Sequence, residues 1–433
     1  MSDKSDAMLT RKGAEQAPNG SRRAFLRGGL AAGGAIAGAT VARAADSDPL
    51  ITEVQPWQQY LGDGVDAVPY GMPIEFEKHV VRRNVEWLTA DTVASINFTP
   101  LHELDGIITP NGLCFERHHG GAAEIRKEDH RLMINGLVDK PLVFTMEDLM
   151  RFPRENHAYF CECAANSGME WRGAQLNGCQ FTQGMIHNVM YTGVPLRLLL
   201  EEAGVKTNGK WIMPEGGDAS AMTRSIPIEK ALDDCLVAFK MNGEALRKEN
   251  GYPVRLVVPG WEANMWIKWL RRIEVGDEPW HHREETSKYT DLLEGGNARR
   301  FTWVMDAKSV VTNPSPQAPL THGKGPTVLT GLAWSGRGTI PRVDVTIDGG
   351  KNWYEARIDG PSLPMSLHRF YFEFDWDGQE MLIQSRAHDS SGYVQPTKDE
   401  LRAFRGENSI YHNNGIQTWL VRADGSAENV EVS

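Results

Sequence analysis

The sequence predicts an α+β protein of two domains, a mixed domain followed by a β-sandwich. The chain has 433 residues, which is too long for one ordinary hydrophobic core. A stretch rich in proline and glycine, residues 312–326, is typical of a boundary between domains. Before this stretch, strand patterns alternate with short helix patterns, whereas after it short strand patterns dominate.

The first domain shows clear start and stop signals for its elements. Residues 132–138 form a strand pattern that contains a glycine. Thr145 is a good helix N-cap and has an aspartate three residues later, the spacing of a capping box. A helix that contains the leucines 198–200 is expected to end at Gly204.

The second domain is predicted over residues 312–433, after a first domain of residues 46–311. Short strands that recur at this spacing and are separated by turns indicate a β-sandwich. Strands are expected at 328–332, 342–347, 369–376 and 381–388, with turns at 348–350 and 389–392.

Residues 1–45 are predicted to be a targeting segment. Arg22 and Arg23 form a twin-arginine pattern, which is followed by a weakly apolar run at 28–41 and small residues at 42–44. The apolar run is shorter than the ~20 residues that span a bilayer. Twin-arginine export carries folded proteins, so the expected location is the periplasm, reached with any cofactor already loaded.

Composition restricts the function classes. Hydrophobic residues make up 41% of the chain and charged residues 24%, as in a soluble globular protein. The net charge of −11 argues against binding to nucleic acid or to an anionic membrane surface. The sequence contains neither a C-x-x-C-H haem site, nor a P-loop, nor a dinucleotide-binding G-x-G-x-x-G after a strand.

Residues 157–168, H-A-Y-F-C-E-C-A-A-N-S-G, form an apolar strand that runs into a turn. Cys161 and Cys163 are two residues apart, so on an extended segment both thiols face the same side. A thiolate at a strand end suits a soft metal, but the spacing alone favours a buried thiol or half of a disulfide. If one cysteine binds metal, four remain, and the sequence does not fix any pairing among them. The five cysteines are Cys114, Cys161, Cys163, Cys179 and Cys235.

The tetrapeptide C-A-A-N at 163–166 resembles the C-A-G-N signature of the sulfite oxidase family of molybdenum enzymes. The resemblance implies that Cys163 is the metal's only protein ligand and that the cofactor is molybdenum held by molybdopterin. It also implies the family's molybdopterin-binding domain, followed by an immunoglobulin-like dimerisation domain. Residues 331–336 and 348–353 of this chain resemble motifs of that second domain.

Further motifs match the family between residues 113 and 289. The resemblance implies that Arg117 binds substrate, that Tyr289 is the active-site tyrosine, and that Arg255 and Lys268 hold the pterin phosphate. Asn250 stands where the family has histidine, and a methionine replaces an arginine shortly before Lys268. The implied catalytic residues are Arg117 and Tyr289, and the implied cofactor-binding residues are Arg117, His118, His119, Asp218, Asn250, Arg255, Trp266, Ile267 and Lys268.

Within the family, the chain resembles the molybdenum subunits of sulfur-oxidising (Sox) systems. The resemblance implies a periplasmic dehydrogenase that oxidises sulfane sulfur bound to a carrier protein. Electrons are expected to pass to a c-type cytochrome subunit, in a heterotetramer built on a homodimer. The alternatives are a dehydrogenase for free sulfite, a reductase of an S-oxide or of nitrate, and a binding module without catalysis.

The preference for carrier-bound sulfur rests on arginines that the family has and this chain lacks. Gly168 and Asn414 stand at two positions where sulfite oxidases place guanidinium groups around their dianionic substrate. Each charge-assisted hydrogen bond is worth roughly 1.5–3 kcal/mol, so their loss disfavours free sulfite. Gly168 is also expected to widen the mouth of the pocket.

Overall fold

The computed structural model describes residue 59, residue 71, residues 74–84 and residues 96–432. The predicted targeting segment, residues 1–45, lies outside these residues. The described part contains many strands and few, short helices, which agrees with the predicted α+β class. Across this part of the chain, no helix is both long and apolar enough to cross a membrane.

The first domain is built on two five-stranded sheets. One sheet is antiparallel throughout, in the order β10-β9-β6-β5, with β11 paired to β9. The other has the order β4-β3-β12-β7-β8, with β12 parallel to β3. The strands are β3 Leu132–Gly136, β4 Leu142–Phe144, β5 Glu155–Glu162, β6 Ile186–Pro195, β7 Trp211–Gly216, β8 Ile226–Pro227, β9 Leu236–Met241, β10 Glu244–Ala245, β11 Arg255–Val257 and β12 Leu270–Gly276.

Short helices connect these strands, and their ends follow the predicted signals. Thr145 caps α3 through a complete capping box with Asp148. Gly204 ends α5 in a left-handed conformation, as the glycine after the leucine run predicts. The helices of this domain are α3 Met146–Leu149, α4 Cys179–Gln183, α5 Leu196–Ala203, α6 Ile228–Asp233 and α7 Arg283–Thr286; small pairs β1 Arg83–Asn84 with β2 Asn97–Phe98 and β13 Asp291–Leu292 with β14 Ala298–Arg299 complete it.

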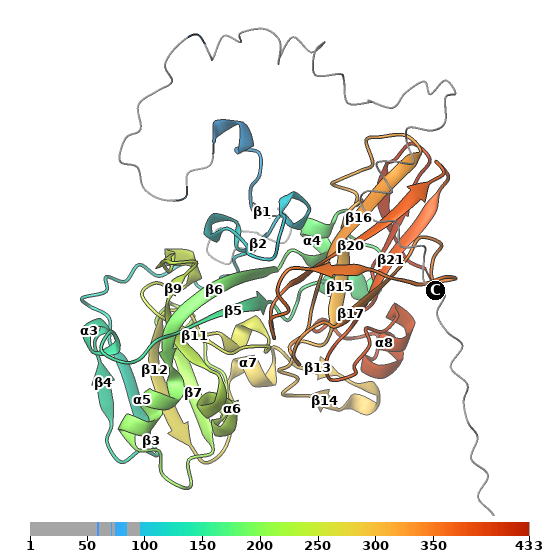
Figure 1. The fold of residues 1–433 in the computed structure, drawn as a ribbon. Coiled ribbons are helices and arrows are strands. Elements are labelled where there is room, and N and C mark those ends of the chain that lie inside the picture. The colour runs from blue at the N-terminus through green and yellow to red at the C-terminus, as the bar shows by residue number, and fades with distance from the viewer. Residues whose placement is uncertain (1–58, 60–70, 72–73, 85–95, 433) are drawn as a thin grey trace, which may run out of the picture. The chain divides into compact units, whose positions relative to one another are not determined.

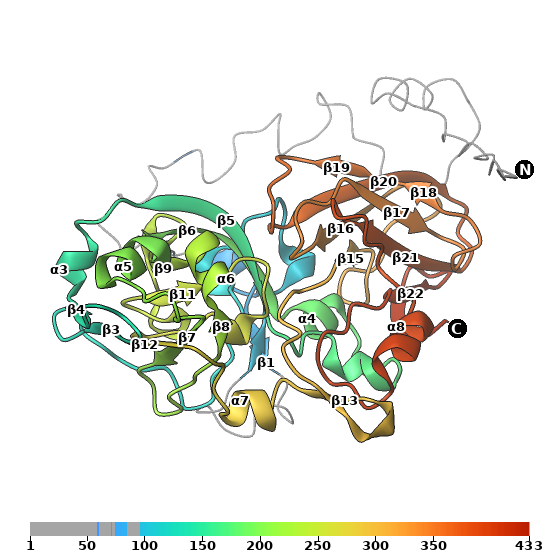
Figure 2. The same ribbon diagram turned by 90° about the horizontal axis from the view of Figure 1, so that it is seen from below.

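The C-terminal part is the expected sandwich of two sheets (Figures 1 and 2). One sheet has the order β15-β16-β20-β19 and the other β18-β17-β21-β22-β23. All four predicted strands are present, as β16, β17, β20 and β21. The elements are β15 Lys308–Asn313, β16 Gly325–Trp334, β17 Arg342–Thr346, β18 Tyr354–Glu355, β19 Arg357–Asp359, β20 His368–Trp376, β21 Met381–His388, α8 Lys398–Arg405, β22 Thr418–Val421 and β23 Ala427–Val430.

The proline- and glycine-rich stretch 312–326 lies inside the sandwich. It connects β15 to β16, which pair as neighbours in one sheet. The sandwich therefore begins upstream of residue 312, with Lys308. Proline and glycine mark a turn, but they do not distinguish a turn between domains from a turn between two strands.

The two domains share buried contacts at the end of β5. Phe160 on β5 and Ile186 on β6 belong to the hydrophobic cluster of the sandwich, together with Val310 and Leu332. The backbone N–H of Phe160 also donates to the carbonyl of Met365, at 2.9 Å. The strand that leads to the two cysteines is therefore fixed against the second domain (Figure 1).

Candidate functional site

One cavity brings the predicted site residues together. The wall includes segments that are up to 174 positions apart, from Phe115 to Tyr289. Every residue that the sequence assigned to the metal, the cofactor or catalysis lines it: Arg117, His118, His119, Cys163, Asp218, Asn250, Arg255, Trp266, Ile267, Lys268 and Tyr289.

The two cysteines enter the cavity from the end of β5. Cys161 is the last but one residue of the strand, Cys163 follows the strand directly, and both line the cavity, as their two-residue spacing predicts. The backbone turns sharply behind them, because Asn166 N–H donates to the Cys163 carbonyl at 2.9 Å and Ser167 is left-handed, with φ +64°. Burial raises the pKa of the Cys163 thiol.

Lys268 forms hydrogen bonds with two other segments of the cavity wall. Its ammonium donates to the carbonyls of Arg117 and Glu249, at 3.2 and 3.0 Å, and to His118 Nδ1, at 3.0 Å. The other ring nitrogen of His118 lies 2.8 Å from a carboxylate oxygen of Glu116. Burial, followed by the charge of Arg255, lowers the pKa of Lys268 to about 7.

Arg255 lies beside Cys161. Its guanidinium donates to the carbonyls of Asn250 and Trp266, at 3.3 and 3.1 Å, and lies 3.9 Å from Cys161 Sγ. The group also lies over the rings of Tyr191 and Trp266. Burial raises the pKa of Cys161 to about 11, against the opposing effect of Arg255, so this thiol stays protonated.

Tyr289 and His119 contact each other in the wall of the cavity. The phenol oxygen lies 3.3 Å from His119 Nε2. Burial raises the pKa of the Tyr289 phenol. Burial, followed by the positive charge of Arg117, lowers the pKa of His119. Both groups are therefore neutral near pH 7. Tyr289 has a left-handed backbone (φ +55°), and its ring packs under the guanidinium of Arg224 and against Tyr411.

Two family models cover most of the described chain. The oxidoreductase molybdopterin binding domain matches residues 119–284, and the Mo-co oxidoreductase dimerisation domain matches residues 299–419. The crystal structure of the sulfane dehydrogenase SoxCD from Paracoccus pantotrophus is similar, with 67% identity and a TM-score of 0.88. The match covers 89% of this chain and 99% of that one. The chain belongs to the sulfite oxidase family of molybdenum enzymes.

More distant relatives of the same family are plant nitrate reductases. The NADH nitrate reductases of Solanum lycopersicum and Glycine max are each 30% identical over 68% of this chain. The chain spans only about a third of their length, 36% and 37%. These comparisons confirm the predicted fold and show that the chain is an oxidoreductase with a molybdopterin-binding domain.

The cavity's own chemistry fits the cofactor of the sulfite oxidase family. Several buried polar atoms that line it have no hydrogen-bond partner within the protein. Such atoms are costly unless a ligand or water satisfies them, and a pterin presents donors and acceptors in one plane. The unsatisfied atoms are Asn250 Oδ1, Arg255 Nε, His187 Nδ1, Asn264 Nδ2 and Asn264 Oδ1.

Two thiols line the cavity, those of Cys161 and Cys163. Within the ranges that the structure describes, no three His, Cys, Asp or Glu residues gather as a metal site. This pattern agrees with a metal that the pterin holds and one cysteine completes. All five cysteines are free and buried, so no disulfide competes for Cys163.

Among the residues of the cavity wall that sequence reasoning missed, two carry unsatisfied polar atoms. Asn264, with both side-chain polar atoms unsatisfied, and His187, which contacts Tyr191 Oη at 3.0 Å, both line the cavity. Asn264 lies two residues before Trp266, which the resemblance assigns to the cofactor. Its position in the sequence, next to that motif, could therefore have identified it. His187 lies on β6, and only its pairing opposite Cys161 reveals it.

The expectation that Gly168 widens the pocket is wrong. Gly168 does not line the cavity, and a Cβ at this position would lie 2.7 Å from the carbonyl oxygen of Ile410. The backbone of Ile410 therefore fills the space that a side chain would take. Asn414 also lies away from the cavity, because its amide donates to Ala307 O and Tyr393 Oη within the second domain.

Proposed function

We propose that this oxidoreductase is the molybdenum subunit of a sulfane dehydrogenase. It oxidises sulfane sulfur carried on a cysteine of another protein, and it passes the electrons to a c-type cytochrome subunit. Support comes from the 67% identity to a sulfane dehydrogenase over 89% of the chain, and from the charges that line the cavity.

Those charges are balanced, and the balance is the observation that carries the proposal. Three cations, Arg117, Arg255 and Lys268, line the cavity, and three carboxylates, Glu116, Asp218 and Glu249, oppose them. A cavity without a clear excess of positive charge favours a weakly charged sulfur over a dianion such as sulfite.

The chain's residues would hold the cofactor and the substrate in separate places. Asn250, Asn264 and Arg255 supply the unsatisfied polar atoms that face a pterin, and Cys163 supplies the thiolate. The bound cofactor supplies oxygen-atom transfer and accepts the electrons. Arg117 attracts the oxygens that the sulfur gains, while the neutral phenol of Tyr289 can donate a hydrogen bond to them.

Features of the sequence and the family likeness support the location, the assembly and the electron acceptor. The twin-arginine pattern at Arg22 and Arg23 supports export of the loaded, folded protein to the periplasm. The dimerisation domain supports a homodimer core. The absence of a C-x-x-C-H haem site in the sequence supports electron transfer to a separate cytochrome.

Stopped-flow reduction of the molybdenum tests the proposal. The purified holoenzyme is mixed with a persulfide-loaded carrier protein, with free sulfite, or, after reduction, with nitrate. We expect the carrier to reduce the metal fastest. Faster reduction by sulfite would support a sulfite dehydrogenase instead. Rapid reoxidation by nitrate would favour a nitrate reductase, the activity named for the plant relatives.

A further inference from the structure

The residue between the two cysteines points away from the cavity and into the second domain. Glu162 is fully buried, and strand alternation turns its side chain to the face opposite Cys161 and Cys163. Its carboxylate accepts hydrogen bonds from Lys308 Nζ at 3.0 Å and from Trp334 Nε1 at 2.6 Å. Both donors belong to the sandwich, on β15 and β16.

Asn166 of the metal-ligand motif joins the same contact. Its amide donates to Glu162 at 2.9 Å, and its carbonyl accepts a second bond from Lys308 at 3.4 Å. Its side-chain oxygen accepts from Met185 N–H at 3.1 Å, and Met185 in turn accepts from Cys163 N–H at 3.0 Å. One ammonium of the second domain therefore contacts both ends of the Cys163 turn.

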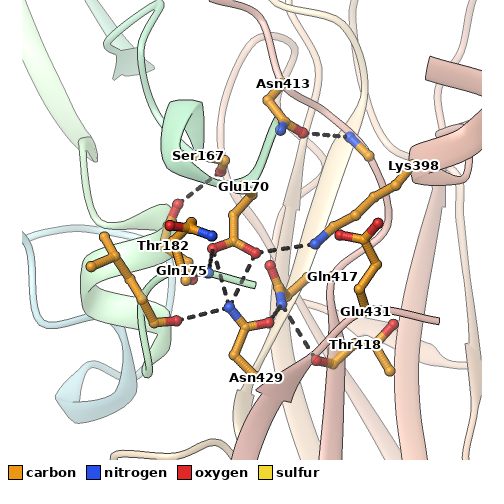
Figure 3. A network of polar contacts seen from close by, with 12 residues as sticks. Ser167, Glu170, Gln175, Thr182, Lys398, Asn413, Gln417, Thr418, Asn429 and Glu431 are labelled. Atoms are coloured by element: carbon orange, nitrogen blue, oxygen red, sulfur yellow. Dashed lines mark hydrogen bonds and ion pairs between the residues drawn. The ribbon is translucent and has the colours of Figure 1, made fainter. Parts of the chain in front are cut away.

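A second buried lysine from the sandwich holds the next part of the chain. Lys398, the first residue of α8, donates to Glu170 at 3.1 Å, and both side chains are buried. Figure 3 shows this pair, with Asn429 of β23 donating to both carboxylate oxygens of Glu170. This pair resembles the Lys308–Glu162 pair in burial and in distance, and in both pairs the lysine belongs to the second domain. Glu170, however, lies seven positions beyond Cys163, whereas Glu162 lies next to it.

We propose that Lys308 is a positioning residue for the molybdenum ligand, acting through Glu162 on Cys163. A carboxylate held by three donors in a buried interface leaves the adjoining residue little freedom, so the thiolate is positioned for the metal. The second domain thus forms part of the metal site in addition to its role in assembly. The inference rests on the proposed assignment of Cys163 as the ligand.

The test compares Lys308→Met with the matched control Lys398→Met. Each variant breaks one buried ion pair at the same domain interface, so both lower the melting temperature by removing one partner of a pair. We expect only Lys308→Met to shift the electron paramagnetic resonance spectrum of molybdenum(V) in the holoenzyme. In that variant kcat should fall about 10–100-fold, as is usual when a residue that positions a metal ligand is replaced, and KM should stay almost unchanged.

Should Lys308→Met not accumulate, the charge-neutral double variant Glu162→Gln with Lys308→Met replaces it, because no buried charge is then left unpaired. Unchanged spectra in the Lys308 variants would overturn the inference, as would equal shifts in the Lys398→Met control. The Cys163→Ser holoenzyme separates the two claims. If its spectrum matches the wild type, the ligand assignment itself fails, whatever the Lys308 variants show.

Discussion

Lys268 gives the sharpest prediction about the cofactor, because its charge changes near neutral pH. Burial and the nearby guanidinium of Arg255 lower the pKa of its ammonium to about 7. At that pKa about 90% of the cofactor-free protein carries the charge at pH 6, and only about 1% at pH 9. An anionic phosphate beside the ammonium favours the charged form of Lys268. Above pH 7, binding of the cofactor is therefore accompanied by uptake of a proton by Lys268.

The expected magnitude follows from that change in charge. Between pH 6 and pH 9 the affinity for molybdopterin should fall about 100-fold, which corresponds to about 2.7 kcal/mol. The control is Lys268→Arg, because arginine keeps its charge over this range and shares every pH effect of the phosphate itself. The assay is pterin fluorescence during titration of cofactor-free protein with molybdopterin. A ratio of wild-type to Lys268→Arg affinity that stays constant with pH would refute the reasoning.

The same pKa shift has a second consequence, for stability without cofactor. The folded-state pKa of Lys268, about 7, lies below the unfolded value of about 10.4, so the folded protein binds fewer protons between these two pH values. Stability of the cofactor-free protein should therefore rise with pH across this window, relative to Lys268→Arg. Parallel melting of the two proteins at pH 7 and pH 9 measures it.

Three further predictions test the ligand, the export route and the assembly. Cys163→Ser should retain pterin but lose turnover and shift the molybdenum(V) spectrum, whereas Cys161→Ser should leave the spectrum unchanged; the reverse result would place the ligand two residues earlier. Lysines in place of both Arg22 and Arg23 should leave the loaded precursor in the cytoplasm, and normal periplasmic levels would contradict this. Sedimentation of the purified chain should give twice the mass of one chain, and a monomer at micromolar concentration would argue against the dimer.

Local patterns predicted most of the fold, because the signals act within a few residues. The capping box at Thr145 and the left-handed Gly204 each fix one end of a helix. The strands of the sandwich follow from alternation over five to ten residues, as in β16 and β21. The site was predicted from motif resemblance, and the cavity confirms that these separated segments meet.

Contacts between distant segments could not be predicted from the same patterns. Lys308 and Glu162 are separated by 146 positions, and the sequence around Lys308 gives no sign that a lysine at the start of a strand is buried. At Gly168 the sequence suggested a feature that the structure does not have. A glycine there suggested open space, whereas the backbone of Ile410, from the second domain, occupies that space. Both features depend on how the sandwich meets the β5 turn.

The cofactor itself changes the charge that a substrate meets. A bound pterin phosphate would offset the two cations assigned to it, Arg255 and Lys268, so Arg117 is left as the cation for the substrate among those that line the cavity. Each charge-assisted hydrogen bond that a further guanidinium would add is worth roughly 1.5–3 kcal/mol, so we expect a dianion to have the lower kcat/KM. Because Ile410 fills the space at Gly168 and Asn414 is held inside the sandwich, an arginine at either position could not simply restore that charge. We therefore expect the contacts between the two domains to keep a guanidinium out of either position.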